Sequence, residues 1–87
     1  MVHKTLTVNN TEGLNIKQSA KIAQALEEFD SKVTIIYGEK VINAKSQINI
    51  ISACVKPGAE ITFQCEGDDE EKALAKIVEI ASQGFNG

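Results

Sequence analysis

The stretch with the most suggestive chemistry is residues 13–19, which read Gly-Leu-Asn-Ile-Lys-Gln-Ser. It follows an alternating apolar run and opens a helical pattern, and a strand-to-helix turn of this kind directs free backbone N–H groups at a bound anion. Asn15 cannot accept a phosphoryl group there as a histidine would, because its amide nitrogen is not a nucleophile. Asn is, however, a favourable N-cap residue. The stretch predicts a helix start that suits an anion but lacks a nucleophile.

Other reactive side chains are few. His3 is the only histidine, and its position on the polar face of an alternating run predicts an exposed strand residue. Cys54 and Cys65 have neither a CxxC partner nor a histidine beside them, so we expect two reduced, largely buried thiols and no metal site. The chain has no Walker, dinucleotide-binding or Ser/His/Asp pattern. We therefore expect no cofactor and no enzymatic activity.

Composition narrows the class of protein further. The 87 residues fit one domain, expected to span 1–87, and the net charge is −3 without a single arginine. A nucleic-acid-binding domain is usually basic and uses arginine for bidentate contacts, so direct binding to nucleic acid is not expected. The N-terminus has no apolar signal region and no run approaches 18 apolar residues, which predicts a cytoplasmic protein without a membrane partner.

The hydrophobic pattern predicts seven elements. Alternation indicates strands, and three-to-four-residue spacing indicates helices. In chain order the expected elements are 2–8, 16–29, 33–37, 40–43, 46–53, 60–66 and a last helix that is capped by Asp68 or Asp69 and stops at Gly84. The apolar stripe expected on the last helix consists of Leu74, Ile77, Val78 and Ala81. The order βαββαβα predicts an α+β, two-layer open-faced sandwich, with three helices on one face of a four-stranded antiparallel sheet.

This order and several short motifs resemble the histidine-containing phosphocarrier (HPr) family of the bacterial sugar phosphotransferase system. The motifs are Phe29-Asp30-Ser31, Lys45-Ser46, Ala59-Glu60-Ile61-Thr62 and Gly67-x-Asp69-Glu70. The family's active-site motif is Gly-x-His-Ala-Arg-Pro-Ala, of which only Gly13 is kept. Asn15 stands where the phosphorylated histidine would be, Lys17 replaces the arginine and Gln18 replaces the proline. The resemblance implies the family's fold in a divergent member that lacks the active-site histidine.

The resemblance also implies a modification site at Ser46. In Gram-positive members, this serine follows a lysine, as Lys45 does here, and a dedicated ATP-dependent serine kinase phosphorylates it. The product then binds a transcription regulator. A phosphoserine at a helix N-terminus places about −1.5 to −2 charges where the helix dipole favours them. Serine is equally a good N-cap with no modification, and the two interpretations are evenly balanced.

The segment after Ser46 forms the family's docking surface, which implies binding roles for Gln47, Ile48 and Ile51. Ile48 and Ile51 are three residues apart and could share one apolar patch or could both be core residues. Gln47 stands where the family usually has an aliphatic residue, and Asn49 where it usually has glycine.

Two hypotheses for the function follow. In the first, the chain is a regulatory relative within the HPr family, phosphorylated at Ser46 and signalling by binding a partner. In the second, it is a small binding or assembly module without phosphorylation, which uses the helix N-terminus near Asn15 and Lys17 to hold an anionic ligand or an acidic partner surface.

Overall fold

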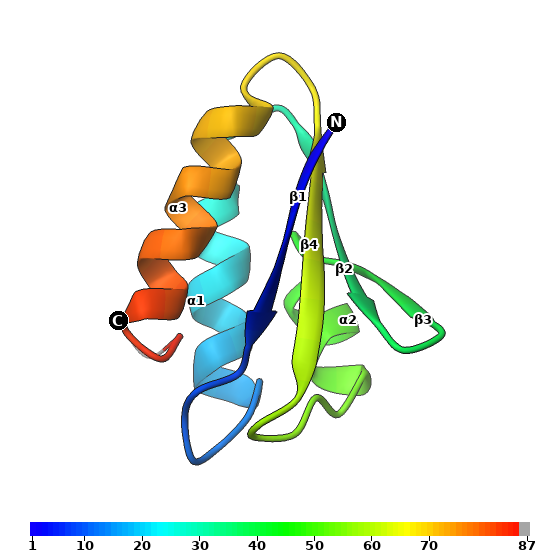
Figure 1. Ribbon diagram of the computed structural model, residues 1–87, viewed down its shortest axis with the longest axis vertical. Coiled ribbons are helices and arrows are strands. Elements are labelled where there is room, and N and C mark those ends of the chain that lie inside the picture. Colours follow the sequence, from blue (N-terminus) through cyan, green and yellow to red (C-terminus); the bar gives the residue numbers. More distant parts are fainter. Residues whose placement is uncertain (86–87) are drawn as a thin grey trace.

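The sheet and its three helices form as the pattern predicts. The computed structural model describes residues 1–85, and Figure 1 shows α1 and α3 running side by side along the sheet. The elements are β1 (Val2–Thr7), α1 (Ile16–Leu26), β2 (Lys32–Tyr37), β3 (Lys40–Asn43), α2 (Gln47–Ser52), β4 (Glu60–Glu66) and α3 (Glu70–Ser82). The four strands are all antiparallel and follow the order β1-β4-β2-β3. The α+β open-faced sandwich of order βαββαβα is therefore confirmed.

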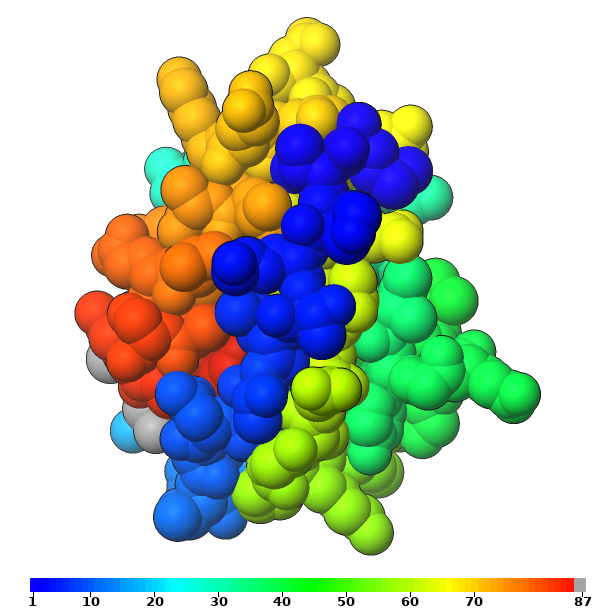
Figure 2. Space-filling view, in the orientation of Figure 1, coloured from blue at the N-terminus to red at the C-terminus, as the bar shows by residue number. Residues whose placement is uncertain are grey.

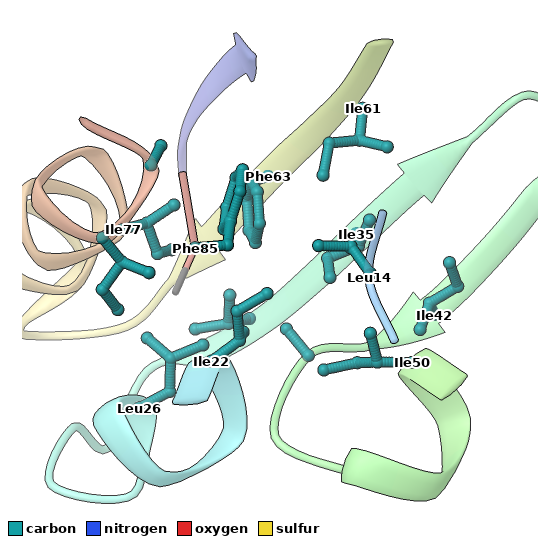
Figure 3. Packing of buried hydrophobic residues seen from close by; sticks show 14 of the residues in the cluster. Leu14, Ile22, Leu26, Ile35, Ile42, Ile50, Ile61, Phe63, Ile77 and Phe85 are labelled. Carbon is teal, nitrogen blue, oxygen red and sulfur yellow. The ribbon is translucent and has the colours of Figure 1, made fainter. Parts of the chain in front are cut away.

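Strand β4 shows why the sheet has one dry face. Ile61, Phe63 and Cys65 alternate toward the helices and are at most 1% exposed. The residues between them face the other way, where the Thr62 hydroxyl lies 2.9 Å from that of Thr5 on β1. Figure 3 shows Phe63 in the centre of the core, which side chains from all three helices complete. In the space-filling view, the β2–β3 hairpin protrudes at the right of the molecule (Figure 2).

Helix α3 buries a stripe different from the predicted one. Val78 is 37% exposed, whereas its buried residues are Ala73, Ile77, Ile80 and Ala81. These residues also lie on one face of the helix. That face is rotated about the helix axis from the predicted one, by less than the angle between two consecutive residues. The predicted stop at Gly84 is confirmed, with φ of +67°. The chain then turns back, so that Phe85 donates its N–H to Ile80 and stacks on Phe63.

Helix α1 ends at Leu26 rather than Phe29, and the loop that follows it is held by the carboxylate of the residue that precedes α3. Of the two predicted cap residues, Asp68 and Asp69, it is Asp69 that lies at the N-cap position of α3, but its side chain does not cap that helix. Its carboxylate accepts the N–H groups of Asp30 and Ser31, each at 2.9 Å, and the Ser31 hydroxyl. The Ser31 hydroxyl, followed by the Asp30 N–H, lowers the pKa of Asp69. The carboxylate therefore joins the α1–β2 loop to the start of α3.

The pKa shift of Asp69 makes the stability of the fold depend on pH. Its ordinary pKa is 3.8, and the folded value is lower, so its stabilising effect is full above the ordinary value and is lost as pH falls through the folded value. We expect Asp69→Asn to lower the urea midpoint at about pH 6 and to flatten its decline toward about pH 3. Asp68→Asn, an exposed neighbour, is the matched control. The same pH profile in both variants would contradict this role.

No helix among residues 1–85 is long and apolar enough to cross a membrane.

Candidate functional site

The N-terminus of α1 is fixed by a close contact between two loops. Gly13 has φ of +76°, and a Cβ built on it would lie 2.4 Å from the carbonyl oxygen of Val55. Leu14 then donates its N–H to that same oxygen at 3.0 Å. The Asn10 side-chain oxygen accepts the Gly13 N–H at 2.6 Å. Glycine is required here because any side chain would push the loop off the segment that follows α2.

Asn15 is the N-cap of α1, as predicted, and its own N–H is already bonded. The side-chain oxygen of Gln18 accepts that N–H at 3.2 Å, an arrangement typical of a capping box. The Gln18 amide in turn donates to the Glu12 carboxylate at 2.7 Å, and Gln18 is fully buried. An anion at this helix start would lie near the Glu12 carboxylate, and the N–H of Asn15 would already be hydrogen-bonded. Sequence reasoning missed Glu12 and the burial of Gln18, although the Asn-x-x-Gln spacing of a capping box was a usable signal.

Ser46 is the N-cap of α2, which confirms that part of the prediction. Its side-chain oxygen accepts the backbone N–H of Asn49 at 3.3 Å and the side-chain amide of Asn49 at 2.8 Å. Ser46 is half-buried. The preceding Lys45 points its ammonium at the carbonyl of Phe29 instead of at Ser46. Lys17, one of the predicted binding residues, is exposed on α1.

The two helix starts lie next to each other and share exposed apolar side chains. The Gln47 side-chain amide donates to the carbonyl of Ile16 at 3.4 Å, which joins α2 to the first residue of α1. Ile16 is 65% and Ile48 77% exposed, whereas Ile51 is half-buried. Ile48 is therefore not a core residue, and Ile50 takes that place. We call the exposed region formed by Asn15, Ile16, Lys17, Ser46, Gln47, Ile48 and Ile51 the α1–α2 surface.

The two cysteines differ in their exposure to solvent. Cys65 is buried, as expected, and its pKa is raised by burial and then by the nearby carboxylates of Glu70 and Asp69. Cys54 is exposed, so the expectation of a buried thiol is wrong there. It follows α2 with a φ of 54°, in the left-handed region that non-glycine residues rarely adopt. Cys54 lines a hollow beside Asn15.

His3 lies far from the α1–α2 surface. It is exposed and sits opposite Gln64 in the pairing of β1 with β4. Figure 1 shows that the start of β1 is at one end of the sheet, whereas the loop before α1 is at the other. Within residues 1–85, no three histidine, cysteine or acidic side chains gather in a way that could hold a metal ion. The imidazole is therefore no part of this site.

The fold and the paired helix starts define a small phosphocarrier-type domain, and comparison with known proteins gives its family. Residues 2–83 match the family model described as "PTS HPr component phosphorylation site". The phosphocarrier protein HPr of Treponema pallidum is 34% identical over 85 residues, which cover 98% of this chain and 97% of that protein. The HPr-like protein Crh of Bacillus subtilis is 34% identical over 77 residues, which cover 88% and 91%.

A solved structure supports the same family assignment. The chain resembles HPr-C-His from Thermoanaerobacter tengcongensis with a TM-score of 0.94 and 31% identity, covering 100% of this chain and 98% of the other. The chain belongs to the HPr family of the phosphotransferase system. Proteins of this family are phosphocarriers rather than enzymes, and the catabolite-repression protein Crh is among this chain's relatives.

The buried amide of Gln18 should matter for stability. Gln18→Ala removes the acceptor of the Asn15 N–H and the donor to Glu12, and we expect a loss of about 1–3 kcal/mol in the free energy of unfolding. Gln24→Ala, on the exposed side of α1, is the control and should cost less than about 0.5 kcal/mol. Urea denaturation followed by circular dichroism measures both. Equal small effects would mean that the Gln18 bonds contribute little.

Proposed function

We propose that this chain is a divergent, regulatory HPr-family protein that lacks the active-site histidine and is switched by phosphorylation at Ser46. The observation that carries the proposal is the contrast between the two helix starts. At the α1 start, Asn15 offers no nucleophile and Gln18 fills its N–H group. At the α2 start, Ser46 offers a hydroxyl on a half-exposed side chain. The proposal takes residues 1–87 as one domain acting in the cytoplasm, where ATP is available to a kinase.

The reaction at Ser46 is an ordinary phosphoryl transfer. The Ser46 hydroxyl oxygen attacks the γ-phosphorus of ATP, a new P–O bond forms, and the bond from that phosphorus to ADP breaks. The hydroxyl proton goes to a base of the kinase, and ADP leaves. This chain supplies only the acceptor, while an HPr-type serine kinase supplies the catalysis. The product carries an added charge of about −1.5 to −2 at pH 7.

The α1–α2 surface gives the modified protein a place to bind its partner. Ile16 and Ile48 are exposed aliphatic side chains beside Ser46, and such grouped apolar exposure is typical of an interaction site. Lys17 adds a cation to the same surface, and Ile51 lies at its edge toward the hollow. A transcription regulator with a complementary apolar and basic face would distinguish the phosphorylated form by its new negative charge. The similarity to Crh supports this regulatory assignment.

The second hypothesis, a module that binds an anion near Asn15 and Lys17 without phosphorylation, receives less support. The carboxylate of Glu12 is bonded to Gln18 beside the helix start and would repel an anion. The Asn15 N–H is also unavailable unless Gln18 moves. An acidic partner surface held by the exposed Lys17 is compatible with the first hypothesis and needs no separate function.

Incubation with an HPr-type serine kinase and ATP tests the proposal. We expect one added phosphoryl group by intact-mass spectrometry, mapped to Ser46 by peptide fragmentation and abolished by Ser46→Ala. Ser52→Ala is the matched control, because Ser52 is an exposed serine on the same helix and its loss should leave the modification unchanged. An unmodified wild-type protein, with a family substrate phosphorylated in the same tube, would refute the Ser46 switch.

A further inference from the structure

The hydroxyl oxygen of Ser46 is held entirely by one residue. Asn49 donates to it twice, from its side-chain amide at 2.8 Å and from its backbone N–H at 3.3 Å. A hydroxyl oxygen has two acceptor lone pairs, so these bonds use both. The shorter bond comes from the side chain, which is exposed to solvent. Within residues 1–85, Asn49 is the residue whose side chain bonds this oxygen.

The residues next to Ser46 in the sequence provide no positively charged side chain that bonds to it. The ammonium of Lys45 is bonded to the carbonyl of Phe29, on the α1 side of the loop. Residues 47–52 contain no lysine or histidine. A phosphoryl group on Ser46 would therefore depend on neutral donors close to it, and the Asn49 amide is already in place.

Phosphorylation changes what these donors can bind. Once Oγ is esterified it becomes a weaker acceptor, while three charged oxygens appear one phosphorus atom away. An N–H group that reached Oγ is then within a side-chain rotation of these oxygens. Hydrogen bonds to a charged acceptor are roughly twice as strong as bonds between neutral groups. Transfer of the Asn49 bond from Oγ to a phosphate oxygen is thus favourable without any movement of α2.

We infer that Asn49 is a positioning residue for the phosphorylated state: its side-chain amide moves from the Ser46 hydroxyl to the phosphate and fixes the phosphoryl group against α2. The inference rests on the proposed function for the identity of the modification, but it concerns a different residue and a different step. Asn49 holds the phosphate after transfer, and its side-chain amide leaves the Ser46 oxygen to free a lone pair for the transfer. A fixed phosphate presents one defined charge pattern to a partner.

A double-mutant cycle with genetically encoded phosphoserine tests the inference without any kinase. The four proteins carry serine or phosphoserine at position 46, with and without Asn49→Ala, and their unfolding is followed in urea. We expect Asn49→Ala to weaken the phosphorylated protein about fivefold more, in its unfolding equilibrium constant, than the unmodified one. The ¹H–¹⁵N signal of the Asn49 side-chain amide should also shift downfield when position 46 carries phosphoserine.

Asn9→Ala, an exposed asparagine in the loop after β1, is the control and should show the same effect in both states. Equal destabilisation by Asn49→Ala in both states, with no shift of its side-chain amide signal, would overturn the inference. A kinase that leaves Ser46 unmodified would count against the proposed function alone, because the phosphoserine in this cycle is installed during translation.

Discussion

The close approach of Gly13 to the carbonyl of Val55 sets the geometry of the whole site. A Cβ at position 13 would lie 2.4 Å from that oxygen, so the two loops can touch only through a glycine. The Leu14 N–H then bonds the same oxygen, and α1 begins immediately afterwards. Since Val55 follows α2, this one contact ties the start of α1 to the far end of α2. The bond from Gln47 to Ile16 completes the attachment at the near end.

The two helix starts lie close together but differ in the hydrogen bonds that their side chains make. At α1, the bonds of Gln18 to Asn15 and Glu12 satisfy the helix start internally. These bonds occupy the N–H of Asn15 and place a carboxylate beside the helix start, which disfavours an anion there. At α2, the Ser46 oxygen accepts a hydrogen bond from the exposed side-chain amide of Asn49. The chain thus keeps the fold of the HPr family, and the proposed function places the modified hydroxyl at the start of the neighbouring helix.

Most of the fold could be predicted from the sequence, because apolar and polar residues alternate clearly along its strands. Ile61, Phe63 and Cys65 of β4 could be assigned to the core from spacing alone, and Gly84 and Ser46 could be assigned to helix ends from residue type. Val78 was misassigned because adjacent apolar residues on α3 allow two overlapping stripes, and only packing against the sheet decides between them. The link from Asp69 to Ser31 joins residues far apart in the chain, which no local pattern reveals.

The site was predicted less completely for a similar reason. The types of Asn15 and Ser46 indicated their cap positions, and Ile48 was named without a decision between surface and core. The burial of Gln18 depends on Glu12 folding back over it, and the exposure of Cys54 depends on a left-handed backbone after α2. Both depend on how the loops are placed in three dimensions, which no local sequence pattern specifies.

The proposed function requires that the start of α1 accept no phosphoryl group, and incubation with enzyme I and phosphoenolpyruvate tests this most directly. Intact-mass spectrometry, at neutral pH to preserve phosphohistidine, should find the wild-type chain unmodified while a histidine-bearing HPr in the same tube is phosphorylated. His3→Gln should behave identically to the wild type. A phosphoryl group that is present on the wild-type chain and retained in His3→Gln would contradict this expectation and show that carrier chemistry survives.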